Sequence, residues 1–365
     1  MWIKRLLKRI ADPVDGWLLL FVLLISALSV VTVYSASNQN PDKVVGKMIT
    51  VIVSLSIMWI VANLKPSQLM MLAPPMYVTG LLLLIAVAAF GVSTNGAKRW
   101  LNIGITKIQP SELMKLAVPM LLAWYFERHE ANLRFRHFVI AAILILVPAA
   151  LVQKQPDLGT AVLIAAAGFY VLFLAGLSWR VMVGLFVAAA ASAPFVWTHM
   201  RDYQRQRILT ALDPMQDPLG KGYHIIQSTI AIGSGGPLGK GWLHGTQTRL
   251  DFIPESTTDF IFAVFGEEFG LWGNLLLSIL YICVIGRGLM ITNQASTQFG
   301  RLLAGALTLS FFTYAFVNMG MVSGILPVVG VPLPLVSYGG TATLSILIGF
   351  GMLMAIHRDK KLMKK

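Results

Sequence analysis

Long apolar stretches recur through the whole of this chain of 365 residues. Hydrophobic residues make up 56% of it and charged residues only 12%, whereas a soluble domain carries about 25% charged residues. No soluble core could bury so much apolar surface, so the chain must use lipid as its solvent. In lipid every backbone polar group has to be satisfied within the protein, which favours α-helices. The sequence therefore predicts an all-α polytopic membrane protein.

Ten apolar ranges are candidates for crossing a bilayer, which needs about 20 residues per helix. We expect spans at 17–35, 48–63, 76–92, 112–126, 138–152, 158–177, 181–197, 260–285, 302–322 and 336–356. The fourth and fifth are short, so tilting or extra polar turns would have to help them across. The first is too long for a signal-peptide core and no A-x-A site follows it, so we expect no cleavage. Residues 1–365 are predicted to form one integral membrane domain.

The orientation follows from the distribution of Lys and Arg, which gather on the cytoplasmic side. With the N-terminus inside, the cytoplasmic segments carry 16 of these residues and the short outer loops carry 6. The outer six are Lys43, Lys47, Lys98, Arg99, Lys107 and Lys154. Both termini are therefore predicted inside. The net charge of +13 is mostly this inner belt, which suits anionic lipid head groups rather than nucleic acid. The single Cys283 allows no disulfide framework and no thiol metal site.

A large extracytoplasmic loop, residues 198–258, separates the seventh and eighth spans and is rich in Gly, Pro and charge. Loops of this length are usually functional, and we expect short helices in it, such as 223–232. Its GSGGPLGKG run resembles a phosphate loop but lacks the G-K-[ST] ending and a preceding strand. We favour a bent loop whose glycines let the backbone approach a ligand.

Four carboxylates stand around the start of the eighth span. Glu255 and Asp259 lie at its mouth, and Glu267 and Glu268 would lie about 12 Å deeper in a helix rising 1.5 Å per residue. Carboxylates cost several kcal/mol in hydrocarbon and are therefore rare there and usually functional. We expect at least one of the four to serve chemistry or transport.

Two other spans open from the outside with an acidic residue after a proline, at Glu112 and at Asp157. Proline and an acid suit the first turn of a helix, so capping alone could account for both. Capping does not explain Lys115, three residues after Glu112 and on the same face. A lysine inside a span needs a partner or an anionic ligand. The pair Lys98 and Arg99 could likewise bind an anion or anchor the chain at the interface.

The last outer segment, residues 323–340, is apolar but interrupted by three prolines and several glycines. Irregular backbone is tolerated at membrane depth only where protein or a cavity surrounds it. We predict a re-entrant segment that walls a groove, with Asn318 tying helices together just before it. The residues alone thus indicate a charged, outward-opening cavity for an anionic, amphiphilic substrate.

Four motifs in order carry a resemblance that extends over nearly the whole chain. They are AKRWLNIG with QPSELMKL, QPDLGT, FIPESTTDFIFAVFGEE, and GILPVVGVPLPLVSYGG with Asn318 upstream. Together they resemble the SEDS family, the shape, elongation, division and sporulation proteins, and its elongation branch more than its division branch. One difference is Thr257, which stands where the family usually has His.

The resemblance implies a peptidoglycan glycosyltransferase of the bacterial inner membrane, active on the periplasmic side during cell elongation. Such an enzyme joins lipid II into glycan strands, with undecaprenyl diphosphate as leaving group. Its expected partners are a class B penicillin-binding protein, which crosslinks the strands, and other proteins of the elongation complex. A flippase for lipid II, or a scaffold that only activates the penicillin-binding protein, is the alternative.

The resemblance also implies roles for particular residues. Asp259 is expected to be the base that takes the proton of the acceptor hydroxyl. The expected substrate-binding residues are Lys115, Glu112, Asp157, Arg99, Glu255, Arg205, Arg207 and Ser337. Lys115, Arg99 and one of the two loop arginines would contact the diphosphate. A divalent cation, Mg²⁺ or Mn²⁺, is left open at the diphosphate, since the sequence contains no dedicated cage for one. Lys115, Asp157 and Asp259 are expected to share one cavity.

Overall fold

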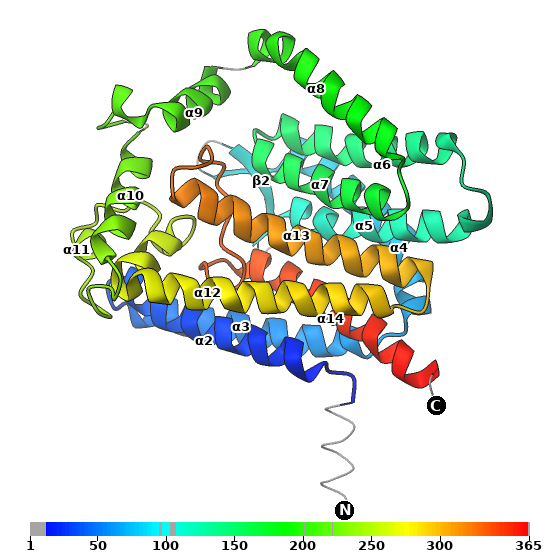
Figure 1. Cartoon of the computed structure of the whole chain (residues 1–365), viewed down its shortest axis with the longest axis horizontal. Coiled ribbons are helices and arrows are strands. Elements are labelled where there is room, and N and C mark those ends of the chain that lie inside the picture. The colour runs from blue at the N-terminus through cyan, green and yellow to red at the C-terminus, as the bar shows by residue number, and fades with distance from the viewer. Residues whose placement is uncertain (1–11, 95–96, 103–106, 201, 221, 364–365) are drawn as a thin grey trace, which may run out of the picture.

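The computed structural model of the protein describes residues 12–94, 97–102, 107–200, 202–220 and 222–363 (Figure 1). Within that part of the chain, a helix lies at each of the ten ranges predicted to be spans, although end residues of those ranges, such as 91–92, 175–177 and 336–339, lie outside the helices. These helices are α2 (Gly16–Ala36), α3 (Pro41–Ala62), α4 (Pro66–Phe90), α5 (Pro110–Arg128), α6 (Phe135–Lys154), α7 (Leu158–Leu174), α8 (Trp179–His199), α12 (Ile261–Gln294), α13 (Gln298–Val322) and α14 (Gly340–Met363). Eight of them are long and apolar enough to cross a membrane, the exceptions being α5 and α7. The all-α membrane fold is thus confirmed, and the number of crossings stays a prediction.

The helices pack as a bundle around α5 and α13 (Figure 1). α13 packs against α12, α7 and α5, while α14 packs along α3 and α2 packs along α12. Most of α5 is buried, including Met114, Met120 and Leu122, so its flanks face other helices rather than lipid. α8 differs from all of these because it has no buried residue and stands apart from the bundle.

The large loop contains its own helices: α9 (Asp202–Leu212), a 3₁₀ turn η2 (Pro214–Gln216), α10 (Tyr223–Gly235) and α11 (Thr246–Arg249). The helix expected at 223–232 therefore exists as the main part of α10. The loop gathers at one end of the bundle (left in Figure 1), and the start of α2 and the end of α14 lie at the opposite end.

A small antiparallel sheet joins α4 to α5, where the sequence reading expected only a loop. Its strands are β1 (Val92–Thr94), β2 (Ala97–Asn102) and β3 (Lys107–Ile108), in the order β1-β2-β3. The Asn95-Gly96 pair between the first two strands is a strong hairpin signal, although that pair lies outside the described residues. The sheet carries Arg99 toward the bundle.

Lys47 was placed in an outer loop, and this prediction is wrong. Asn40 caps α3 by accepting hydrogen bonds from the backbone N–H groups of Asp42 and Lys43, and Pro41 occupies the first turn. The helix therefore begins seven residues before the predicted Met48, and Lys47 lies inside it, fully buried. An Asn-Pro pair is a recognised signal for a helix start, and here it outweighs the polar character of the first turn.

The segment between α13 and α14 forms no regular structure, and Gly324, Gly330 and Leu335 have positive φ. Its buried carbonyls are satisfied by side chains from four helices. Ser29 on α2 binds the carbonyl of Val336, Lys47 on α3 those of Leu335 and Ser337, Tyr281 on α12 that of Pro334, and Asn318 on α13 that of Val331. The segment is therefore held in place from all around, as irregular backbone in a membrane protein must be.

We predict that Lys47→Met destabilises the protein. The Nζ atom of Lys47 donates to the carbonyls of Leu335 at 2.9 Å and Ser337 at 2.7 Å, and both acceptors lose their donor in this variant. Each orphaned buried group costs about 1–3 kcal/mol, so the unfolding midpoint in detergent should fall clearly. Lys43→Met, at a half-exposed site on the same helix, is the control. Equal midpoints for the two variants would contradict the prediction.

Candidate functional site

Asp259 lies in the turn directly before α12, where the large loop meets the bundle. Its carbonyl accepts a hydrogen bond from Nδ2 of Asn318 at 2.8 Å, which ties the turn to α13. Its half-buried carboxyl group has no hydrogen-bond donor among the described residues. Gly330, with φ of 78°, passes close by, and a β-carbon there would lie 3.4 Å from Oδ2. The backbone of Asp259 is thus fixed while its carboxyl group stays available.

A cavity of about 610 Å³ opens at Asp259, within the range of about 300–1,000 Å³ found for small-molecule sites. α9, α10 and the loop between them form one side, and the turn before α12 and the irregular segment form the other. The lining residues are Gln206, Arg207, Thr210, Asp217, Gly220, His224, Ile225, Glu255, Asp259, Phe260, Val328 and Gly330. The segment 323–340 therefore walls the cavity through Val328 and Gly330.

The surroundings of Asp259 raise its pKa to about 6. Burial is the largest cause, because it penalises the charged form, and the nearby charge of Glu255 acts in the same direction. Arg99 and Arg207 oppose the shift, and Asp157 adds to it weakly. Asp259 is therefore a carboxylate at neutral pH, with the affinity for a proton that a general base needs.

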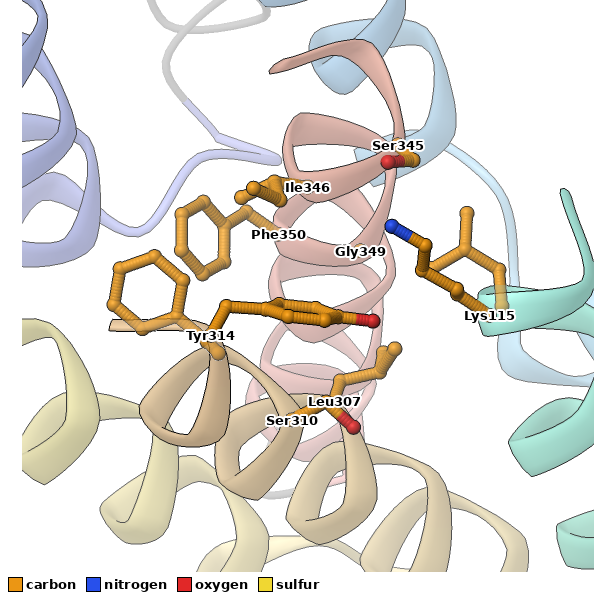
Figure 2. Close-up of a pocket in the computed structure, with 10 residues that line it drawn as sticks. Lys115, Leu307, Ser310, Tyr314, Ser345, Ile346, Gly349 and Phe350 are labelled. Carbon is orange, nitrogen blue, oxygen red and sulfur yellow. The ribbon is translucent and has the colours of Figure 1, made fainter. Parts of the chain in front are cut away.

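Glu112 and Lys115 form a close pair inside the bundle. Nζ of Lys115 lies 2.6 Å from Oε1 of Glu112, and the hydroxyl of Ser345 on α14 donates to Oε2 at 2.7 Å. The ammonium group also lies 5.0 Å from the ring centre of Tyr314 on α13. Figure 2 shows Lys115 facing Ser345 and Tyr314 across a small cavity of about 30 Å³. The pair thus links α5 to α13 and α14.

Arg99 and Asp157 meet at the start of α7. The Nη1 atom of Arg99 lies 3.7 Å from Oδ2 of Asp157, and its Nη2 atom donates a hydrogen bond to the carbonyl of Pro156 at 2.7 Å. Asp157 also caps α7 by accepting a hydrogen bond from the backbone N–H of Thr160 at 3.1 Å. Capping and ion pairing therefore occur together at Asp157. Lys98, next to Arg99, is exposed and can serve as the interfacial anchor.

The remaining predicted substrate-binding residues fall into two groups. Arg207 and Glu255 line the cavity. Arg205 instead donates to the carbonyls of Trp197 and Thr198, at 2.8 and 2.6 Å, and so holds the end of α8. Ser337 is buried, donates to the carbonyl of Thr258 at 2.6 Å and accepts from the N–H of Leu333 at 2.8 Å. Its hydroxyl is occupied in holding the turn that carries Asp259.

The structure brings the predicted residues near one another without one shared cavity. Asp259 lines the larger cavity and Lys115 the smaller one. Asp157 lines neither cavity, but its charge acts on both Asp259 and Lys115. A β-carbon on Gly159, two residues after Asp157, would collide with Val329, which places the start of α7 beside the cavity wall.

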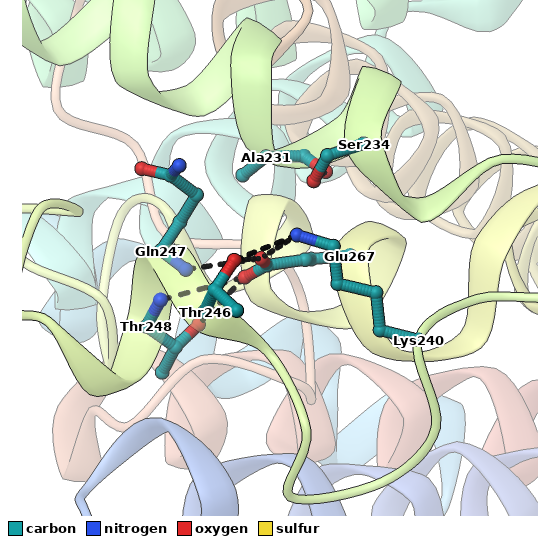
Figure 3. A network of polar contacts seen from close by, with 7 residues as sticks. All are labelled: Ala231, Ser234, Lys240, Thr246, Gln247, Thr248 and Glu267. Atoms are coloured by element: carbon teal, nitrogen blue, oxygen red, sulfur yellow. Dashed lines mark hydrogen bonds and ion pairs between the residues drawn. The ribbon is translucent and has the colours of Figure 1, made fainter.

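Unlike the carboxylate of Asp259, that of Glu267 is held in a network of hydrogen bonds with residues of the large loop (Figure 3). It is fully buried and accepts hydrogen bonds from Lys240 at 2.8 Å, from Thr246 at 3.1 Å and from the backbone of Gln247 at 3.0 Å. Thr248 contributes two longer bonds at 3.4 Å. Glu267 therefore pins the large loop to α12 and is not free for chemistry.

The glycine-rich run of the loop wraps the backbone of α12. The N–H groups of Lys240 and Gly241 each donate at 3.0 Å to the carbonyls of Glu267 and Glu268, and a β-carbon on Gly239 would collide with α12. α12 is itself broken at Gly270, where φ is 63°. These glycines were expected to let backbone approach a ligand, but the group they approach is α12.

The sequence reading missed several residues of the cavity, of which His224 is the most notable chemically. His224 lies in the first turn of α10, in the sequence GYHIIQ, and no ligand motif marks it. Thr257, which replaces the family's usual His, is buried, and its carbonyl accepts the N–H of Tyr338 at 2.8 Å. Among the residues that the structure describes, no group of three or more His, Cys, Asp or Glu could hold a metal ion.

Comparisons with known proteins agree with this architecture. Residues 15–362 match the family model described as cell cycle protein, covering FtsW, RodA and SpoVE. The chain is 51% identical over 352 residues to peptidoglycan glycosyltransferase MrdB of Escherichia coli K12, across 96% of this chain and 95% of that one. It is 34% identical over 370 residues to the probable peptidoglycan glycosyltransferase FtsW of Geobacter metallireducens, across 98% of both.

Two solved structures share the fold. One, from work on structural coordination of polymerization and crosslinking by a peptidoglycan synthase complex, aligns with a TM-score of 0.83 and 36% identity over 95% of this chain and 98% of that one. The other, the rod shape determining protein RodA of Thermus thermophilus, aligns with a TM-score of 0.72 and 28% identity over 95% of this chain and 97% of that one.

A double-mutant cycle on Glu112 and Lys115 tests whether Lys115 only stabilises the fold or also contacts the substrate. Lys115→Met leaves a buried carboxylate without its cation, which costs about 3–5 kcal/mol, so its unfolding midpoint in detergent should fall. Adding Glu112→Gln removes that charge and should restore much of the loss. If Lys115 also acts on the substrate, the stabilised double variant will still make no polymer. Strictly additive losses of stability would contradict the coupling of the pair.

Proposed function

This chain belongs to the cell cycle protein family of FtsW, RodA and SpoVE, and from that membership we propose that it is a peptidoglycan glycosyltransferase. It joins lipid II units into glycan strands during cell elongation and releases undecaprenyl diphosphate. The observation that carries the mechanism is the Asp259 carboxyl group. It lines a cavity of about 610 Å³, accepts no hydrogen bond from the described residues, and has its pKa raised to about 6.

In the proposed reaction Asp259 is the general base. The acceptor sugar hydroxyl gives its proton to the Asp259 carboxylate while its oxygen attacks the anomeric carbon of the donor. The bond between that carbon and the lipid diphosphate breaks, and the diphosphate leaves with the electron pair. One C–O bond forms and one breaks, and the proton rests on Asp259 until water removes it.

Cationic groups must stabilise the charge that grows on the diphosphate. Arg99 and Arg207 are our first assignments, because both act electrostatically on Asp259 from outside the bundle core. Lys115 supports this region from within, where it pairs with Glu112 and its charge also acts on Asp157. Asp157 orients Arg99, Glu112 holds Lys115, and Glu255 lines the cavity beside the base. Arg205 and Ser337 act indirectly, by holding α8 and the turn before α12.

A lipid substrate needs a path from the bilayer to the cavity, since removing a polyprenyl tail from the membrane costs about 0.8 kcal/mol per CH₂. α8 buries none of its residues and leads directly into α9, which lines the cavity through Gln206, Arg207 and Thr210. Because little packing holds α8, we propose that lipid II enters past this helix from the outer leaflet.

The protein is a multi-pass membrane protein, and its finer placement is part of the proposal. The start of α2 and the end of α14 lie at the end of the bundle opposite the large loop (Figure 1). With Lys and Arg concentrated at that end, both termini face the cytoplasm of a bacterial inner membrane and the Asp259 cavity faces the periplasm. There it meets a class B penicillin-binding protein, which crosslinks the new strands.

Asp259→Asn should abolish polymer formation from lipid II by the purified protein. General base catalysis contributes about 10²- to 10⁴-fold, and the amide cannot take the proton. The expected result is loss of glycan strands on a gel at unchanged unfolding midpoint. Asp251→Asn, at an exposed carboxylate of the same loop, should retain activity. Polymer synthesis by a folded Asp259→Asn protein would refute the role, and a wild type that makes none would favour the flippase or the scaffold.

The pH profile gives an independent test. Because the base must be ionised, kcat/KM should rise tenfold per pH unit below about pH 6 and level off above it. Glu255 raises the pKa of Asp259 and Arg99 and Arg207 lower it, so Glu255→Gln should move the midpoint to lower pH. Burial persists in that variant, so the midpoint should stay above the ordinary value of 3.8. A midpoint that does not respond to Glu255 would assign the profile to another group.

A further inference from the structure

The imidazole of His224 lies in the same cavity as Asp259, the proposed base, and its nitrogen atoms make no hydrogen bond with the described residues. It lines the same cavity as Asp259 and Glu255, from the first turn of α10. The centre of its ring lies 5.6 Å from the ring centre of Phe260, the residue after Asp259. Within the described part of the chain no group forms a hydrogen bond with the imidazole, and Nδ1 is buried. The edge that can reach a ligand is therefore the one that carries Nε2.

The imidazole is neutral at neutral pH. Burial is the main cause that lowers the pKa of His224, and the charge of Glu255 only partly opposes it. The positive end of α10 also disfavours an imidazolium. With no acceptor near the buried Nδ1, the proton belongs on Nε2, where it faces the cavity.

The charges of the cavity select an uncharged ligand at this position. Among the described residues that line the cavity, Asp217, Glu255 and Asp259 contribute carboxylates, and Arg207 is the cation. Such a surface disfavours a diphosphate close to His224 but accepts hydroxyl and acetamido groups. A neutral N–H donor suits the oxygen atoms of a sugar.

Resting on the proposed function, we propose that His224 is a positioning residue for the acceptor sugar. Its Nε2–H donates a hydrogen bond to an oxygen of the sugar in the cavity, and this contact turns the attacking hydroxyl toward Asp259. His224 takes no proton in the reaction. The diphosphate is bound instead by Arg99 and Arg207, the two cations assigned to it above.

The test measures binding of lipid II in detergent micelles to an Asp259→Asn background, which prevents turnover. His224→Phe keeps the aromatic contact with Phe260 but removes the donor. One lost hydrogen bond corresponds to about a tenfold weaker Kd. His224→Gln, whose amide nitrogen can take the place of Nε2, should restore most of the affinity, whereas His224→Asn, which matches Nδ1, should not.

Two controls make the outcome specific. Undecaprenyl diphosphate without the sugars should bind His224→Phe as it binds the parent protein. His199→Phe, at an exposed histidine that stacks on Phe195 with ring centres 4.2 Å apart, should leave lipid II affinity unchanged. Unfolding midpoints of all variants check the fold.

Unchanged lipid II affinity in His224→Phe would overturn the proposal, as would an equal loss for undecaprenyl diphosphate or rescue by Asn instead of Gln. These readouts do not need turnover. A protein that binds lipid II through His224 but never polymerises it would leave the positioning role intact and refute the glycosyltransferase instead.

Discussion

The site depends on how the buried backbone between α13 and α14 is satisfied. Ser29, Lys47, Tyr281 and Asn318 donate to its carbonyls from four different helices. Without these donors several polar groups would be orphaned in an apolar setting, at about 1–3 kcal/mol each. Lys47 is fully buried and binds two of these carbonyls. The irregular segment is therefore held by side chains of the surrounding helices, although it has no internal ladder of hydrogen bonds.

The same contacts hold the turn that carries Asp259, the proposed base. Ser337 and Tyr338 bind the carbonyls of Thr258 and Thr257, and Asn318 bridges the carbonyls of Asp259 and Val331. The backbone of Asp259 is thus held in place, while its carboxyl group accepts no hydrogen bond from the residues that the structure describes. Preorganisation of this kind lets a carboxylate meet its substrate without rearrangement of the protein at the moment of reaction.

The apolar character of the ranges and their length were sufficient to predict the helices, because lipid leaves the backbone no alternative. Motifs in sequence were sufficient to point to Asp259. What they could not predict depends on contacts across the fold: Lys47 was assigned to a loop, Ser337 was expected to bind substrate, and nothing marked His224. A buried lysine and an exposed one look alike in sequence until the helix start is placed correctly. The sheet that carries Arg99 was missed because its strands are short and lie between long helices.

Asp259 and Glu267 show how two carboxylates near the start of one helix can have different surroundings. Glu267 is surrounded by donors from Lys240, Thr246, Gln247 and Thr248, which stabilise its charge and fasten the loop to α12. Asp259, eight residues earlier, receives none on its carboxyl group within the described chain, and burial raises its pKa. A carboxylate with satisfied lone pairs is a poor base, and one without donors in a partly buried site is a better one. The large loop causes this difference. It contributes all the donors that bind Glu267, whereas at Asp259 its residues form one wall of the cavity. The loop is therefore both a structural clamp and one side of the site.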